Sequence, residues 1–564
     1  MTYDIVIRGG RVIDGTGRAE FKADIAIQGN RIAEVGDVKE KGTREVDAEG
    51  KLVTPGFVDI HTHLDAQLAW DPIASSSCYH GVTSVVLGNC GVTFAPCKPA
   101  DREYLAKMME SVEDIPAESI KEGLSWNWES YGDYLDCLEQ LPKGVNVGGM
   151  VGHCAVRYHA MGERSLEQEP ASDADIERIC ALVDEAIEHG ALGFSTSRTF
   201  MHRVPDGRPV PGTYADPKEL LAIGSVLGKW KRGVFEAAAR LGERDNEQLD
   251  NTRAEVEWMA KISRDNDVNV TFGLASSNRR PQLFRRVIEF AEEHNARGAH
   301  LRPQTTCRGI GGLFGLHNRT PFDAAAPWQA LKTLTLEERL ARLRDPARRD
   351  ELVACVDLEA LRLDFDHVYV LKPGQVRYDN DPNNSLGALA RARGVNPVEA
   401  FIDLSLETDG KAVLSFASLN PNLESVVEMI TNPTVAMGLA DSGAHVGQIM
   451  DASQPTWLLQ YWVREKGLFT IEEAIRRWTS DTAGIFGIRE RGVLRSGHYA
   501  DVNVIDLDRV EVLTPEYVHD FPAGAGRYVQ RANGFDMTIV NGEVFMENGV
   551  HAGALAGQML RSTD

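Results

Sequence analysis

The sequence is short of positive charge. Its 564 residues include 83 Asp and Glu but only 60 Lys and Arg, which gives a formal net charge of −23. Because nucleic acids and anionic membranes are also negatively charged, most of such a surface would repel them. We therefore expect neither a nucleic-acid partner nor a membrane partner.

The sequence also lacks the run of about 18 apolar residues that a membrane-spanning helix needs. Its first residues, Met1-Thr-Tyr-Asp, have no basic stretch leading into an apolar one, so no secretory signal is visible. The eight cysteines are scattered without closely spaced pairs, which is typical of free thiols in a reducing compartment. We expect the protein to be cytoplasmic.

Both ends of the chain are rich in strand patterns and poor in helix. Short alternating segments recur in residues 1–53 and again in 490–564, where Asn541-Gly542 is a strong hairpin signal. With 43% hydrophobic residues, the chain can bury one large core and a smaller one. We predict that the two ends together form a small, discontinuous β domain.

Residues 54–489 alternate between apolar strand candidates and helical patterns. One helix is expected to begin at Ser172 and to end near Gly190, because its apolar residues recur at helical spacing. A long gap before the last strand indicates an insertion at about 310–400, which we expect over the barrel mouth. The predicted strands are Phe57–Ile60, Ser84–Leu87, Val145–Val151, Ala191–Phe194, Gly233–Ala237, Val268–Leu274, Ala299–Pro303 and Val435–Ala440. Eight strands separated by helices predict an α/β fold, the (β/α)8 barrel.

Two histidines follow the first of these strands. His61 and His63 are spaced i, i+2, so they leave an extended backbone on the same side. Imidazoles at the carboxyl end of a strand can share a divalent metal. A His-x-His pair alone is weak evidence, but its position after an apolar run and before Asp65 favours a metal role.

Other polar residues stand at the ends of later strands, where catalytic groups of such barrels collect. Cys90 lies between glycines after the second strand, and its thiolate would be a strong zinc ligand, although a buried structural thiol is the alternative. His153 follows the third strand and is either a ligand or substrate contact or a satisfied polar residue. Asp441 follows the eighth strand, with His445 close behind, and could bind metal and move a proton unless it merely caps a turn.

These segments resemble the amidohydrolase superfamily, and within it the N-acyl-D-amino-acid deacylases. The resemblance implies the barrel, a β-sandwich built from both termini, and hydrolysis of a C–N bond by a metal-activated water. The motifs that carry it are Pro55-Gly-Phe-Val-Asp-Ile-His-Thr-His63, Gly88-Asn-Cys-Gly91, Val151-Gly-His153, Gly193-Phe-Ser-Thr196, Gly212-Thr-Tyr-Ala215, Asp481-Thr-Ala-Gly484 and Gly497-His-Tyr-Ala-Asp501.

The chain departs from the deacylase pattern at the fifth and sixth strands. In that family both strands supply a histidine that joins the cysteine in holding a tightly bound zinc, whereas this chain has Ala238 and Gly273 at those positions. The remaining ligands are His61, His63, Cys90 and Asp441. Glu236 is a further candidate because it lies two residues before Ala238, on the same strand face. We therefore expect about one zinc per chain, with another divalent metal as the alternative.

The leading interpretation is a metal-dependent amide hydrolase in which Asp441 moves the proton. Its expected substrate is a small N-acyl amino acid, with the D-form favoured, or a similar carboxylate-bearing amide. Arg240 would bind the substrate carboxylate, unless it forms an ordinary ion pair, and His153, Asp65 and His445 are further candidate substrate contacts. A hydrolase of cyclic amides, imides or other unusual amides is one alternative, and a metal-free, non-catalytic binding protein on the same fold is another. A homo-oligomer is left open.

Overall fold

The barrel is built around parallel strands whose carboxyl ends meet at one edge. The computed structural model describes residues 2–563, and in this range eight parallel strands form one sheet in the order β16-β12-β11-β10-β9-β8-β7-β6. A parallel bridge between Thr62 and Ser442 joins the segments that follow the first and last strands, so the sheet curls round and closes. The predicted (β/α)8 fold is confirmed. The strands are β6 (Phe57–Asp59), β7 (Val82–Leu87), β8 (Asn146–Gly152), β9 (Gly193–Ser197), β10 (Val234–Ala238), β11 (Asn269–Gly273), β12 (Leu301–Thr305) and β16 (Ala436–Met437).

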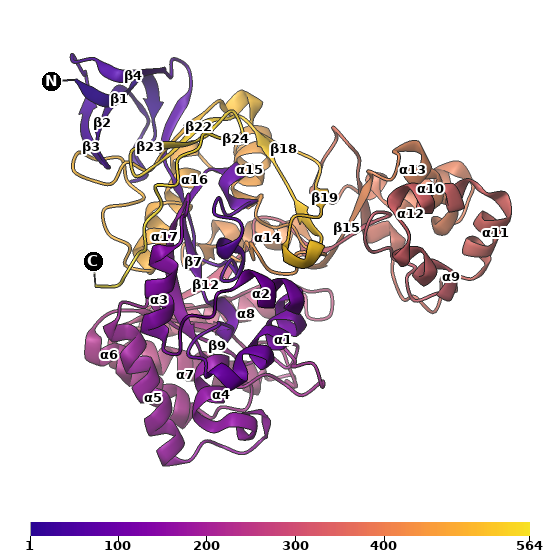
Figure 1. The fold of residues 1–564 in the computed structure, drawn as a ribbon, viewed down its shortest axis with the longest axis horizontal. Helices are drawn as coiled ribbons and strands as arrows, with labels where there is room; N and C mark the ends of the chain where they lie inside the picture. The colour runs from indigo at the N-terminus through magenta and orange to yellow at the C-terminus, as the bar shows by residue number, and fades with distance from the viewer. Residues whose placement is uncertain (1, 564) are drawn as a thin grey trace.

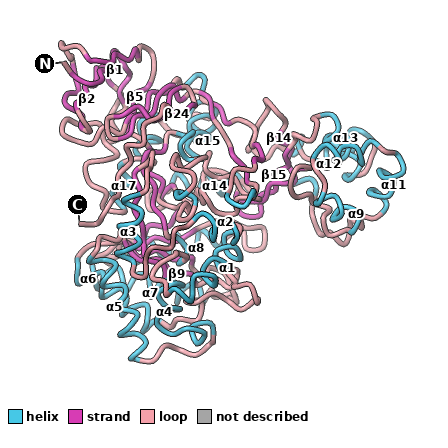
Figure 2. The backbone as a smooth tube through the Cα atoms, in the orientation of Figure 1, coloured by secondary structure: helices cyan, strands magenta, loops and turns pink. Residues whose placement is uncertain are grey.

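Helices pack around these strands, as Figure 2 shows in the lower half of the view. The helix predicted from Ser172 is α5, and it begins with a capping box: the Ser172 hydroxyl accepts from the Asp175 N–H, and the Asp175 carboxylate accepts from the Ser172 N–H. The helices of the barrel are α1 (Arg102–Glu113), α2 (Ala117–Gly123), α3 (Tyr131–Gln140), α4 (His153–Met161), α5 (Asp173–Glu188), α6 (Pro217–Trp230), α7 (Asp250–Asn266), α8 (Leu283–Asn295), α14 (Leu423–Thr431), α15 (Gln454–Trp457), α16 (Ile471–Arg477) and α17 (Ser480–Ile485). A π-helical segment, Leu458–Glu465, continues α15.

Both chain ends contribute to a second, largely antiparallel sheet. Among the described residues it has nine strands in the order β24-β23-β22-β17-β5-β1-β2-β3, with β4 paired to β1. Its inner side chains, including Ile25, Val53 and Ile539, form a separate apolar core. Its strands are β1 (Tyr3–Val12), β2 (Phe21–Gln28), β3 (Arg31–Gly36), β4 (Gly42–Asp47), β5 (Leu52–Pro55), β17 (Val502–Ile505), β22 (Phe535–Val540), β23 (Glu543–Glu547) and β24 (Val550–His551). We propose residues 1–53 and 490–564 as the bounds of this domain.

The insertion forms an arm with its own apolar core, which includes the aromatic residues Phe322, Trp328 and Phe401. Figure 1 shows its helices at the far end of the long axis, so they project sideways and do not cover the barrel mouth as we expected. Its elements are β13 (Ile310–Gly315), α9 (Ala326–Gln329), α10 (Leu336–Arg344), α11 (Pro346–Ala354), β14 (Val368–Leu371), α12 (Leu386–Arg393), α13 (Pro397–Glu407) and β15 (Val413–Leu419), in which β13, β14 and β15 form one antiparallel sheet.

The segment before β22 returns to the barrel as two short ladders, β18 (Glu511–Val512) with β21 (Ala532–Asn533) and β19 (Glu516–Val518) with β20 (Arg527–Val529). The Tyr528 N–H donates to the carbonyl of Val446, in the loop after β16. The C-terminal segment therefore supports the edge of the barrel where strand ends meet. No helix in residues 2–563 is long and apolar enough to cross a membrane.

Candidate metal centre and active site

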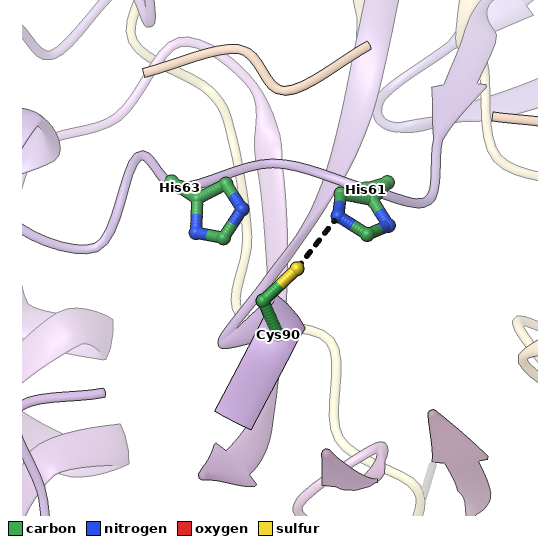
Figure 3. Close-up of side chains that lie close together, drawn as sticks. All are labelled: His61, His63 and Cys90. Atoms are coloured by element: carbon green, nitrogen blue, oxygen red, sulfur yellow. Dashed lines mark hydrogen bonds between the residues drawn. The ribbon is translucent and has the colours of Figure 1, made fainter. Parts of the chain in front are cut away.

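His61 and His63 are held at the carboxyl edge of the barrel by backbone hydrogen bonds that this segment donates to its neighbours. The Thr62 N–H donates to the Val86 carbonyl at 3.2 Å, and the His63 N–H donates to the Ser442 carbonyl at 2.7 Å. This backbone is extended between β7 and the loop after β16, so both imidazoles lie on the same side of it (Figure 3). Each histidine is 1% exposed, and the ring centroids are 5.6 Å apart.

Cys90 reaches the same place from the end of β7. It adopts a left-handed backbone conformation (φ 54°) in the short turn Asn89–Gly91. A Cβ atom on Gly91 would lie 2.6 Å from the backbone nitrogen of Ser197, so glycine is required for the turn to pack this closely against β9. The Cys90 Sγ lies 3.4 Å from His61 Nε2, as the dashed line in Figure 3 marks.

Two carboxylates complete this group. Asp441, which follows β16 and has a φ of 46°, places its Oδ1 3.2 Å from His61 Nε2 and 3.8 Å from His63 Nε2. Glu236 on β10 is fully buried, and its Oε2 accepts the Cys90 N–H at 2.9 Å. Its Oε1 has no hydrogen-bond partner in the described part of the chain. The structure thus brings all five predicted metal-site residues together.

The donor set fits a zinc ion. One candidate ligand atom from each of His61, His63 and Cys90 lies within 4.8 Å of the other two. Imidazole nitrogen and thiolate sulfur are the preferred ligands of zinc in tetrahedral sites. A carboxylate oxygen of Asp441 is within reach of both imidazoles and can serve as the fourth ligand. The free Oε1 of Glu236 is a further oxygen donor.

Burial and neighbouring charges shift the pKa values of these side chains. Burial raises the pKa of Glu236 to about 7 and lowers that of His63 to about 3. For His61 burial is outweighed by the hydrogen bond and charge of Asp441, which raise its pKa to about 9. Burial also raises the pKa of the Cys90 thiol, and the neighbouring charge of Glu236 raises it further. Negative charge is therefore costly here without a positive partner, and a divalent ion would stabilise both carboxylates and the thiolate.

Sequence reasoning missed Glu113, the last residue of α1. This side chain is 3% exposed, with its Oε1 3.7 Å from His63 Nδ1 and its Oε2 3.8 Å from His445 Nε2. Burial and the charge of Asp441 raise its pKa well above the usual value for a glutamate. It ends a helix rather than a strand, so inspection of strand ends could not reveal it.

Sequence reasoning also missed His202. It follows β9 by five residues and is anchored by its Nδ1, which lies 2.8 Å from the Ser197 hydroxyl. Burial lowers its pKa to about 4, and the nearby His445 acts in the same direction. The signal that could have found it is its place in the loop that follows a barrel strand.

Arg240, the predicted ligand of the substrate carboxylate, is only partly paired within the protein. Arg240 is partly exposed, donates to the Thr213 carbonyl at 2.6 Å and lies over the Phe200 ring at 5.0 Å. Its Nε is 3.7 Å from Glu255, an acid that already pairs with Arg198 at 3.1 Å. The Arg240 guanidinium is therefore incompletely paired and can still bind a carboxylate.

The prediction that His153 contacts the substrate is wrong. His153 is fully buried, its Nδ1 bonds to the Thr196 hydroxyl and its Nε2 to Glu219, both at 2.8 Å, so neither nitrogen is left for a metal or a substrate. Asp65 is also buried, and its Oδ2 accepts the Gly88 N–H at 3.3 Å, which holds the turn that carries Cys90. Its Oδ1 has no hydrogen-bond partner in residues 2–563, so a substrate contact through Asp65 stays a prediction.

The sheet register bears on the two absent histidines. Ala237 pairs with Phe272, so the next residues along β10 and β11, Ala238 and Gly273, are neighbours at the carboxyl edge. A Cβ atom on Gly273 would find only Leu439 within 4 Å, at 3.6 Å. The backbone at Gly273 therefore has room for a side chain on this side of the strand.

Comparisons with known proteins agree with this architecture. A model of the amidohydrolase family matches residues 44–546. An uncharacterized protein of Mycobacterium tuberculosis (strain ATCC 25618 / H37Rv) is 30% identical over 96% of this chain and 90% of its own. D-aminoacylase of Alcaligenes xylosoxydans xylosoxydans is 27% identical over 100% of this chain and 98% of its own.

The solved structure of N-acyl-D-glutamate deacylase from Bordetella bronchiseptica, complexed with zinc and a phosphonate inhibitor, has a similar fold. Its TM-score is 0.65 at 23% sequence identity, and the match covers 100% of both chains. The resemblance inferred from the motifs is confirmed. This chain belongs to the amidohydrolase family.

Proposed function

We propose that this chain is a zinc-dependent hydrolase that cleaves the amide bond of a small N-acyl amino acid, with a D-amino acid the preferred substrate. The observation that carries the proposal is the meeting of two imidazoles, one thiol and two carboxylates at the carboxyl edge of the barrel. The relatives named D-aminoacylase and N-acyl-D-glutamate deacylase support the substrate class.

His61, His63, Cys90 and Asp441 would hold the zinc, with Glu236 as an additional ligand or an immediate neighbour. When bound, zinc supplies a Lewis acid that polarises a carbonyl and lowers the pKa of water. Asp441 would accept a proton and later return it to the leaving nitrogen. Its Oδ1 lies within 4 Å of both imidazoles, which supports this role.

Arg240 would bind the substrate carboxylate. Its guanidinium is incompletely paired and follows β10 at the same edge as Glu236. Arginine binds carboxylates through two parallel hydrogen bonds, which would orient the amide as well as hold it. Arg240→Leu should therefore raise KM for N-acyl amino acids by at least tenfold. It should leave KM unchanged for the matching N-acyl amino-acid amides, which lack the carboxylate.

The test is a panel of N-acyl D- and L-amino acids, with metal content measured on the same preparation. We expect hydrolysis of D-substrates by protein with about one zinc per chain, loss of activity on chelation and recovery on zinc addition. Preferential hydrolysis of a cyclic amide would favour the alternative chemistry suggested by the missing histidines. Protein that neither holds metal nor turns over any amide would contradict the proposal and favour a binding protein.

A further inference from the structure

Glu113 is a buried carboxylate without a conventional partner. Its Oε1 forms no hydrogen bond within residues 2–563, and the same holds for the Nδ1 atom of His63. These two atoms face each other at 3.7 Å. An isolated buried carboxylate is costly, so a role for it in the protein with a bound metal would explain its presence.

The two nitrogens of His63 face different carboxylates. Nε2 lies 3.8 Å from Asp441 Oδ1 on the side of the metal residues, whereas Nδ1 faces Glu113. A neutral imidazole has one N–H and one lone pair, and a carboxylate beside one nitrogen favours the proton there. The lone pair then remains on the other nitrogen, as a metal ligand requires.

We propose that Glu113 is a positioning residue for the metal site: it holds the proton of His63 on Nδ1, so that Nε2 is presented as the ligand. This inference rests on the proposed zinc site. The separation of 3.7 Å is longer than a hydrogen bond. Once His63 Nε2 binds the metal, the imidazole proton can only be on Nδ1. This N–H is then a hydrogen-bond donor that the Glu113 carboxylate can move closer to.

The other carboxylate oxygen of Glu113 lies near the loop that begins with Asp441. Oε2 lies 3.8 Å from His445 Nε2, in the loop that begins with Asp441. One backbone and one side-chain hydrogen bond also anchor this loop: the His445 N–H donates to the Glu113 carbonyl, and the Gln448 side-chain amide donates to the Asp114 carboxylate at 2.7 Å. The backbone bond does not depend on the Glu113 carboxylate, so substitutions can separate anchoring from proton placement.

The experiment measures zinc affinity by competition with a chelator, together with the thermal midpoint of unfolding with and without zinc. Glu113→Gln should weaken zinc binding by about 10- to 100-fold, the range found when a carboxylate behind a metal-binding histidine is lost. The midpoint of the metal-free variant should equal or exceed that of the metal-free wild type, since a costly buried charge is removed. Glu113→Asp keeps the charge and should recover part of the affinity.

Gln448→Leu is the matched control, because it weakens the same anchor but leaves the carboxylate in place. It should lower the midpoint and keep the zinc affinity. The inference is overturned if Glu113→Gln binds zinc as tightly as the wild type, or if Gln448→Leu loses as much affinity as Glu113→Gln. A wild type that binds no zinc would overturn the proposed function as well, which distinguishes that failure from the first two.

Discussion

The backbone N–H of Cys90 donates a 2.9 Å hydrogen bond to the carboxylate of Glu236. This bond ties the turn after β7 to the middle of β10, three strands away in the sheet. It uses one oxygen of Glu236 and leaves the other oxygen unpartnered among the described residues. Glu236 can therefore fix the position of the thiol and still offer an oxygen to the metal, in the part of the site where the family's two histidines are absent.

Glu236→Gln should weaken zinc binding by at least tenfold. Glutamine can still accept the Cys90 N–H, but it brings no negative charge to the cation. Chelator competition and zinc content after dialysis measure the effect. Glu219→Gln is the control, because Glu219 is equally buried but pairs with His153 and Arg157. Glu219→Gln should lower the stability of the protein and keep its zinc. If Glu236→Gln binds zinc as tightly as the wild type, Glu236 is not a metal ligand.

Cys90→Ala should lower zinc occupancy and turnover together. A ligand thiolate is protected from alkylating reagents while the metal is bound, and it becomes reactive when a chelator removes the metal. Mass spectrometry of alkylated protein tests this, with the buried Cys78 and Cys97 as internal controls whose labelling should not depend on zinc. Full zinc and full turnover in Cys90→Ala would limit the resemblance to the deacylases to the fold.

The parts of the site that lie at strand ends were predictable from sequence. His61, Cys90 and Asp441 each follow an apolar strand pattern, and the carboxyl ends of parallel strands meet at one edge of a barrel, so spacing along the chain predicts proximity in space. Glu113 was not predictable, because it ends a helix and reaches His63 only through the tertiary packing of α1.

The sequence also could not predict where the last strand ends or in which direction the insertion projects. The apolar pattern predicted a strand over Val435–Ala440, but β16 ends at Met437 because Leu439 takes a left-handed conformation with a φ of 53°. That conformation is rare for a leucine and has no sequence signal. The insertion projects sideways because it packs around its own core, which includes Trp328.

His80 should make stability depend on pH. It is fully buried, its Nδ1 bonds to the Thr456 hydroxyl at 2.7 Å, and its Nε2 bonds to the Gln530 carbonyl at 3.1 Å. Burial lowers its pKa to about 3, from an unfolded value near 6.5. The unfolded chain therefore binds an extra proton below pH 6.5, and this contribution to stability falls by about 1.4 kcal/mol per pH unit until the folded pKa is reached.

Denaturant unfolding of the wild type and His80→Gln at several pH values tests this expectation. The wild type should be more stable at pH 7.5, and its advantage should shrink by about 2 kcal/mol by pH 5, because glutamine does not titrate. Thr456→Val removes one hydrogen-bond partner but keeps the imidazole buried, so it should retain the wild-type pH dependence. Parallel profiles for the wild type and His80→Gln would contradict the prediction.

Asp441→Asn should reduce kcat by at least about 100-fold while the protein stays folded, since a general base contributes on this scale. The substitution suits the backbone, because Asp441 has a φ of 46° and asparagine tolerates this left-handed region well. The turn after β16 should therefore persist, and the thermal midpoint should change little. Steady-state kinetics with the substrate identified in the panel measures the loss.

Asp451→Asn is the control for Asp441→Asn. Asp451 is a buried aspartate in the same part of the chain, and it pairs with Arg308 at 3.3 Å rather than with the histidines. Its loss leaves a buried guanidinium without its carboxylate, so the thermal midpoint should fall while most of kcat is retained. A near-normal kcat in Asp441→Asn would show that another group moves the proton, whereas a collapsed midpoint would show that the carboxylate of Asp441 is needed to form the turn.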